Sequence, residues 1–192
     1  MVTNGHPMDD IAEESDIITY EQKPFLFQNQ GTGAYREVGA ETGAYFRTPE
    51  TGRGLAVSDY DNDGDLDLLF TPNNRKATLL RNEGGAAAGH WITLRLVGVR
   101  VNRDAIGARV TVRAGGRTQT AEVRSASSYL SQNDMRLHFG LGSATRVDGI
   151  EIRWPARVKQ VETIGPLPAD QFVTLREGAG VVSRAAPGPR AR

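Results

Sequence analysis

The stretch from Asp59 to Asp67 has the sequence DYDNDGDLD, which places five aspartates within nine residues around one glycine. Carboxylates this close together repel one another, so a loop without a counter-charge would be strained or would retain extra protons. Ca²⁺ removes this repulsion, because it takes about six to eight oxygen ligands and accepts a flexible acidic loop. Gly64 permits the sharp turn that brings early and late ligands to one point. The stretch therefore predicts a calcium-binding loop.

The residues around this loop indicate that it joins two β-strands. Its first half resembles an EF-hand loop, but that motif ends in a Glu, and Phe70 occupies the corresponding position here. The apolar runs at 55–57 and 66–71 are short and are bounded by Gly and Pro, which favours strands over the helices of an EF-hand. The loop is therefore expected to close on Asp67 rather than on a distant Glu.

Two alternatives to a calcium loop stay open. Asp, Asn and Gly favour turns in any protein, so the stretch could be a solvated acidic turn, although five aspartates exceed what a turn requires. Mg²⁺ is a weaker candidate than Ca²⁺, because it prefers a small octahedral shell that retains water. The expected role is structural, since no nucleophile lies nearby in the sequence. The expected ligands are the side chains of Asp59, Asp61, Asp63 and Asp67, with the backbone carbonyl of Asp65.

Composition excludes several classes of partner. The 192 residues suit one large or two small domains, and 23 basic residues balance 23 acidic ones. A balanced charge gives no global field toward nucleic acid or a membrane surface. There is no cysteine, so disulfides and thiolate metal sites are excluded, and no apolar run reaches the roughly 18 residues of a membrane span. The 22 glycines and nine prolines indicate the many turns of an all-β protein.

Residues 1–87 contain an internal repeat. The segment LFQNQG at 26–31 reappears as LLRNEG at 79–84, 53 positions later. A repeat of this period is typical of β-propellers. The segment amounts to about one and a half blades, so we expect a partial propeller that carries the calcium loop and belongs to something larger. The expected strands are 23–28, 34–38, 55–59, 66–71 and 77–82.

Residues 88–178 have a different pattern, and we expect them to form a β-sandwich. Short alternating strands separated by turns over about 90 residues are typical of that fold. Residues 179–192 are rich in Ala, Pro, Gly and Arg, and we expect a disordered tail there. The expected sandwich strands are 91–97, 109–113, 118–123, 136–139, 149–154, 158–163 and 172–175.

Several motifs resemble known families. Gly54–Val57 leading into the acidic loop, together with Leu68–Phe70 and Leu79–Asn82, is similar to an FG-GAP/VCBS propeller repeat. Four later motifs resemble the ASPIC/UnbV domain, which follows such repeats in secreted proteins related to cartilage acidic protein. The resemblance covers roughly residues 20–178. Those motifs are Asn102–Arg109, Ser127–Asp134, His138–Gly142 and Trp154-Pro155.

The resemblance implies a calcium-supported propeller joined to a β-sandwich. It also implies a place outside the cell or in the cell envelope, and a non-catalytic role in adhesion or in recognition of a protein or glycan. Because family members carry enough repeats to close a propeller, the chain is expected to be an N-terminally truncated fragment whose upstream repeats and export signal are missing. The chain departs from the family at Ala126, where Gly is common, and at Ala156-Arg157, where Ser-Gly usually follows the Trp-Pro pair.

A catalytic function is the main alternative. Ser131, Asp134 and His138 could form a hydrolytic site, or the domain could serve as an enzyme or accessory protein in bacterial biosynthesis. The sequence contains no G-x-S-x-G elbow, so we expect no enzyme activity.

Two further clusters have open roles. In Asn102-Arg103-Asp104 the arginine could grip a carboxylate or a sugar, but a structural role in pinning the loop is favoured. Trp154 is expected to be a core residue that ends a strand, with sugar stacking as the alternative. We predict no function for His6 or His90.

Overall fold

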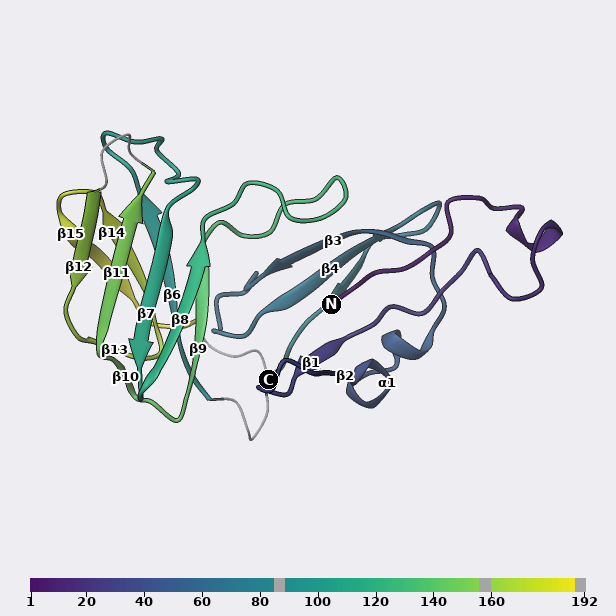
Figure 1. Ribbon diagram of the computed structural model, residues 1–192, viewed down its shortest axis with the longest axis horizontal. Helices are drawn as coiled ribbons and strands as arrows, with labels where there is room; N and C mark the ends of the chain where they lie inside the picture. The colour runs from purple at the N-terminus through teal and green to yellow at the C-terminus, as the bar shows by residue number, and fades with distance from the viewer. Residues whose placement is uncertain (85–88, 156–159, 189–192) are drawn as a thin grey trace. The chain divides into compact units, whose positions relative to one another are not determined.

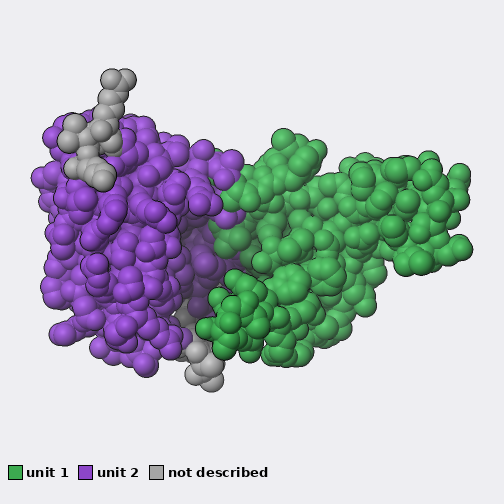
Figure 2. Space-filling model, viewed as in Figure 1, with its two compact units in different colours: residues 1–57, 68–80, 127–132 green, residues 58–67, 81–126, 133–192 purple. Residues whose placement is uncertain are grey.

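The computed structural model describes residues 1–84, 89–155 and 160–188 (Figure 1). This part of the chain is all-β, as predicted, and none of its sheets closes on itself. No helix within it is long and apolar enough to cross a membrane. The expected domain boundary at 87/88 and the Ala156-Arg157 turn lie outside the described residues. The chain forms two compact units, coloured separately in Figure 2: unit 1 comprises 1–57, 68–80 and 127–132, and unit 2 comprises 58–67, 81–126 and 133–192.

Unit 1 contains small open sheets and short helices. Its apolar centre includes Phe70, which is fully buried and packs against the ring of Tyr45 with 4.6 Å between ring centroids. Each strand expected in this part overlaps an observed one. Strands β1 (Phe27–Asn29) and β2 (Tyr35–Glu37) pair antiparallel, and β3 (Gly52–Ser58), β4 (Asp67–Pro72) and β5 (Thr78–Leu80) form a three-stranded sheet in that order. The helices are η1 (Ile11–Glu13), α1 (Gly39–Thr42) and η2 (Tyr45–Arg47).

The two copies of the sequence repeat fold into the same local turn. The Asn29 side-chain oxygen accepts a hydrogen bond from the Gly31 N–H at 2.8 Å, and Asn82 accepts one from Gly84 at 3.1 Å. Both glycines have positive φ, 79° and 67°, which glycine adopts without steric cost. The shared Leu-x-x-Asn-x-Gly sequence therefore forms the same Asx turn after a strand in both places.

Unit 2 contains two four-stranded sheets that share one apolar core, the arrangement of a β-sandwich (Figure 1). One sheet has the order β12-β11-β7-β8 and the other β15-β14-β6-β9, with β6 and β14 parallel. Strands β10 (Arg146–Val147) and β13 (Leu167–Pro168) pair separately. The sheet strands are β6 (His90–Val97), β7 (Arg109–Ala114), β8 (Arg117–Glu122), β9 (Leu137–Gly142), β11 (Gly149–Trp154), β12 (Gln160–Ile164), β14 (Gln171–Arg176) and β15 (Gly180–Ala185).

Alternation along the strands builds this core. Val110 and Val112 of β7, and Ile150 and Ile152 of β11, are at most 1% exposed, while the residues between them face outward. Burying one such side chain contributes about 1.5–3 kcal/mol relative to leaving it in water. Trp154 is 4% exposed within the same cluster, which confirms the predicted core role.

The C-terminal segment corrects the sequence prediction. The expected disordered tail at 179–192 contains strand β15, which pairs antiparallel with β14. The Gly-rich composition reflects a hairpin turn, because Gly178 and Gly180 both have positive φ. Strands β10 and β13 were also not predicted, since two residues are too few to show alternation. Val158, where one strand was expected to begin, lies outside the described residues.

Candidate metal centre

The acidic loop joins two strands, as predicted. Asp59 directly follows β3, and Asp67 is the first residue of β4. The loop turns through Asn62 and Gly64, whose φ angles are 58° and 99°. A Cβ on Gly64 would lie 2.2 Å from the indole of Trp91, so this position requires glycine both for its backbone and for the close approach to the ring.

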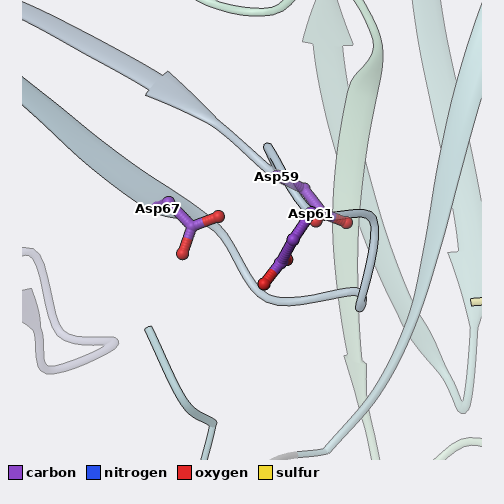
Figure 3. Close-up of side chains that lie close together, drawn as sticks. All are labelled: Asp59, Asp61 and Asp67. Atoms are coloured by element: carbon purple, nitrogen blue, oxygen red, sulfur yellow. The ribbon is translucent and has the colours of Figure 1, made fainter. Parts of the chain in front are cut away.

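Three of the predicted ligand residues meet at one place. Asp59, Asp61 and Asp67 each offer a carboxylate oxygen within 4.8 Å of the other two (Figure 3). Asp59 and Asp67 are each only 2% exposed. Asp63 is also buried, but one of its oxygens accepts the Asp65 N–H at 2.9 Å, and neither Asp63 nor Asp65 belongs to the group of three.

Backbone N–H groups hold the two most buried carboxylates in place. The two oxygens of Asp59 accept from the N–H groups of Asp63 at 3.1 Å and Gly64 at 3.0 Å. The oxygens of Asp67 accept from Tyr60 at 3.1 Å and from Asn82 at 2.8 Å. A carboxylate oxygen has two lone pairs, so each of these atoms can still bind a cation after accepting one hydrogen bond.

These hydrogen bonds do not fully compensate the burial of negative charge. Burial raises the pKa of Asp59, and the bonds from Gly64 and Asp63 offset only part of that rise. Burial likewise raises the pKa of Asp67. The charge on Asp63 adds to the rise in both pKa values. The loop therefore places more negative charge in a buried position than its own donors stabilise.

The donor set fits a hard divalent cation. All the candidate ligand atoms are carboxylate oxygens, which Ca²⁺ prefers. Asp61 Oδ1 is buried and has no hydrogen-bond partner among the described residues. The cations near the group are arginine side chains: the Arg81 Nε lies 4.0 Å from Asp61 Oδ2, and the charge of Arg136 lowers the pKa of Asp59. A bound cation would satisfy the Asp61 oxygen and neutralise the crowded group.

Arg136 supports the loop, and the sequence pattern did not reveal it. Its guanidinium donates to the backbone carbonyl of Asp59 at 2.9 Å and to the Asn62 side-chain oxygen at 2.6 Å. It also forms an ion pair with Asp134 and lies 5.2 Å above the ring of Phe172. These partners are up to 77 positions away. The only local signal was the Asp-x-Arg spacing just before β9.

The residues considered for hydrolysis have other local partners. Ser131 donates to the Tyr129 carbonyl at 2.9 Å. Asp134 forms the ion pair with Arg136, and the Nδ1 atom of His138 lies 3.0 Å from the Thr93 hydroxyl. His138 also stacks on Trp91, and burial lowers its pKa.

The three residues of the Asn102-Arg103-Asp104 cluster have different environments. Asn102 pins its loop, because its side chain donates to the Ile106 carbonyl at 2.9 Å and accepts from the Ile106 N–H at 2.7 Å. Arg103 and Asp104 are exposed, and the described residues include no ion pair between them. His90, to which no function was assigned, contacts Asp170 at 2.6 Å.

Comparison with known families identifies one domain. Residues 98–182 match the family model described as ASPIC and UnbV, so an ASPIC/UnbV domain is present there. The match confirms the C-terminal part of the resemblance seen in the sequence. It starts in the loop after β6 and ends inside β15, so the beginning of the supposed tail belongs to the domain. A search of curated proteins found no match.

Proposed function

We propose that this protein is a non-catalytic recognition module that Ca²⁺ stabilises and that acts outside the cell or in the cell envelope. One observation carries the proposal: the buried carboxylates of Asp59 and Asp67 lie with that of Asp61 within 4.8 Å. Residues 1–87 would be an FG-GAP/VCBS-like repeat that includes this loop, and the ASPIC/UnbV domain would present a surface to a protein or glycan partner.

The metal would act by ordering the connection between β3 and β4. An ion held by Asp59 and Asp67 would tie the end of one strand to the start of the next. The ordered loop would also seat Gly64 against Trp91, whose ring stacks on His138 of the sandwich. Calcium would therefore stabilise the loop together with the part of the sandwich on which it packs.

The contacts of three polar side chains support the recognition role. The hydroxyl of Ser131, the carboxylate of Asp134 and the imidazole of His138 each bond to a local partner rather than to one another. A nucleophile needs a base within hydrogen-bond reach, and these contacts do not supply one. These contacts support the binding role that we propose for the domain.

Thermal unfolding tests the metal. The melting temperature is measured with excess Ca²⁺ and with excess chelator, in the wild type and in Asp61→Asn. At free calcium about 100-fold above its dissociation constant, the wild type should gain about 2.7 kcal/mol. For a chain of this size that gain corresponds to roughly 5–10 °C in melting temperature. Asp61 is the best position to change because its free oxygen makes no hydrogen bond among the described residues, so Asn should remove calcium binding with little damage to the loop.

The matched control is Asp16→Asn, which changes an exposed aspartate outside the loop. It should retain the full calcium-dependent gain, whereas Asp61→Asn should melt at the same temperature with calcium and with chelator. An equal melting temperature for the wild type under both conditions would refute the calcium proposal. A gain of equal size with Mg²⁺ at the same concentration would assign the site to magnesium instead.

A further inference from the structure

A cleft of about 530 Å³ opens at one end of the β15-β14-β6-β9 sheet, well away in sequence from the acidic loop. Its volume lies within the range of small-ligand sites, roughly 300–1,000 Å³. Its walls combine branched aliphatic side chains with two arginines. The lining residues are Val97, Gly98, Val99, Val101, Arg103, Arg176 and Val182.

One wall of the cleft is a loop that hydrogen bonds anchor. A single oxygen of Glu177 accepts hydrogen bonds from the N–H groups of Val99, Arg100 and Val101, at 2.8, 2.7 and 3.2 Å. Glu177 is 4% exposed, and its other oxygen pairs with the Arg100 guanidinium at 3.2 Å. Three consecutive backbone N–H groups behind the cleft are therefore anchored to one buried carboxylate.

The same loop fixes the position of Arg103. The Gly98 N–H donates to the Arg103 carbonyl at 2.9 Å, and a Cβ on Gly98 would lie 2.2 Å from the Asn102 carbonyl oxygen. The loop thus folds back tightly on itself and sets Arg103 at the edge of the cleft. A site on a preorganised backbone loses less entropy when a ligand binds.

The charge in the cleft is available to a ligand. Among the described residues, neither Arg103 nor Arg176 forms an ion pair, whereas the neighbouring Arg100 is paired with Glu177. Arginine binds carboxylates through two parallel hydrogen bonds, so two such groups in one cleft favour a carboxylate ligand. Several other arginines of the sandwich have an acidic neighbour, such as Arg113 and Arg153 with Glu151.

Two of the valines that line the cleft are about half exposed to solvent. Val99 is 54% exposed and Val182 is 50% exposed. Val182 is the extra residue of a bulge in β15, because Thr174 pairs with Ser183 while Leu175 pairs with Val181. Bulges often redirect a side chain toward a site. Here the bulged residue lines the same cleft as the two arginines.

We propose that this cleft binds the C-terminal end of a peptide whose last residue is aliphatic. The terminal carboxylate would pair with Arg103 and Arg176, and the last side chain would pack on Val99 and Val182. A peptide end places a carboxylate one carbon from a branched side chain, which matches the mixed lining. An inorganic anion would leave the valines without a partner, and half-exposed valines form too open a wall to enclose a long acyl chain. The proposal gives the recognition role a ligand class but does not depend on calcium binding.

An NMR titration of the full-length protein tests the proposal. The probe is the tripeptide Gly-Ala-Val with a free carboxylate, and the readout is the amide signals of Val99, Arg103 and Val182. We expect these signals to shift together and to saturate. The same peptide with an amidated C-terminus should bind at least about tenfold more weakly, because hydrogen bonds to a charged group are lost. Arg103→Gln and Arg176→Gln should each weaken binding by about tenfold or more.

The matched control is Arg109→Gln, which changes an exposed arginine on the other sheet and should leave the affinity within about twofold. Absence of shifts, or equal affinity for the amidated peptide, would overturn the proposal. Equal binding of hexanoate would assign the cleft to a fatty acid, and equal binding of inorganic phosphate would make it a simple anion site; both results would also overturn it. Repeating the titration with Asp61→Asn separates the two proposals, since loss of the calcium effect should leave peptide binding unchanged.

Discussion

Two loops of unit 2 use buried carboxylates to hold their backbones, and they differ in how the negative charge is compensated. Glu177, which directly follows β14, accepts three backbone N–H bonds from the loop after β6 and one bond from the Arg100 guanidinium, and the bonds from Val99 and its neighbours lower its pKa to about 2. In the acidic loop, Asp59 and Asp67 each receive two N–H bonds, yet burial raises both pKa values.

The difference lies in the ratio of donors to charges. One carboxylate with four donors is stabilised by the protein alone. Asp59 and Asp67 are crowded by Asp63, and Asp61 has one oxygen with no hydrogen-bond partner among the described residues. A loop of the first kind is complete without a metal, while a loop of the second kind gains from a cation. For this reason we propose Ca²⁺ for the acidic loop and a ligand site beside the loop that Glu177 anchors.

The largest expected effect comes from a glycine in the acidic loop. Gly64→Ala combines backbone strain at a φ of 99° with a Cβ only 2.2 Å from the Trp91 ring. Together these should cost about 3 kcal/mol or more. Gly178, next to Glu177, has a φ of 74° but nothing within 4 Å of the added atom, so Gly178→Ala should cost about 1–2 kcal/mol.

Urea unfolding of both variants, followed by near-UV circular dichroism, measures the difference. Gly64→Ala should also weaken the calcium-dependent gain in stability, because the turn that gathers the ligands is displaced. Gly178→Ala should keep that gain in full. Equal destabilisation by the two substitutions would show that the Trp91 contact does not constrain the acidic loop, and the comparison between the loops would then lose its structural basis.

An intermediate effect is expected at Glu177. Replacing it with Ala leaves three backbone N–H groups of the 99–101 segment without their acceptor, and the melting temperature should fall by several degrees. Glu177→Gln keeps one oxygen in place and should cost less. Neither loss should change when calcium is added, because Glu177 bonds to the segment after β6, whereas the acidic loop contacts Trp91 near the start of that strand.

The control for this pair is Glu122→Gln, which alters an exposed glutamate of β8 and should leave the melting temperature nearly unchanged. If the Glu177→Ala variant melted like the wild type, the loop would be held by other contacts. The preorganisation assumed for the cleft would then have no support.

Local pattern predicted much of this architecture. The spacing of the aspartates and the short apolar runs beside them predicted a loop between two strands, and alternation predicted the sandwich strands. The Trp154 core position also followed from its place at a strand end. The metal itself remains a prediction. In each confirmed case the signal lies within a few neighbouring residues, where side-chain period and turn chemistry act directly.

The residues that local pattern missed act over long distances in sequence. Arg136 supports Asp59 and Asn62 from 77 and 74 positions away, and Glu177 holds Val99 from 78 positions away. No spacing rule encodes such pairs, because the fold creates them. Strand β15 was missed for a different reason: a glycine-rich hairpin turn has the composition of a flexible tail. Asp63, expected as a side-chain ligand, accepts the Asp65 N–H through one oxygen and lies outside the group of three, and its role as a ligand stays a prediction.

The smallest and most discriminating effect is the pH dependence, which should have opposite signs at the two loops. A carboxyl whose folded pKa is raised gives a stability contribution that is present at low pH and is lost as the pH rises through that pKa. This applies to Asp59 and Asp67. Glu177 is the reverse: its contribution is present above its ordinary pKa of 4.5 and is lost as the pH falls toward about 2.

Urea unfolding in chelator, repeated between about pH 2 and 7 for wild type, Asp59→Asn and Glu177→Gln, isolates each group as a difference from wild type. The stability of Asp59→Asn relative to wild type should rise with pH, because the variant avoids a charge that the metal-free loop stabilises poorly. The stability of Glu177→Gln relative to wild type should instead fall as the pH rises from 2 to about 5. Calcium should abolish the first trend above pH 6 and leave the second unchanged. Two trends of the same sign would mean that the acidic loop neutralises its own charge, and the need for a cation would disappear.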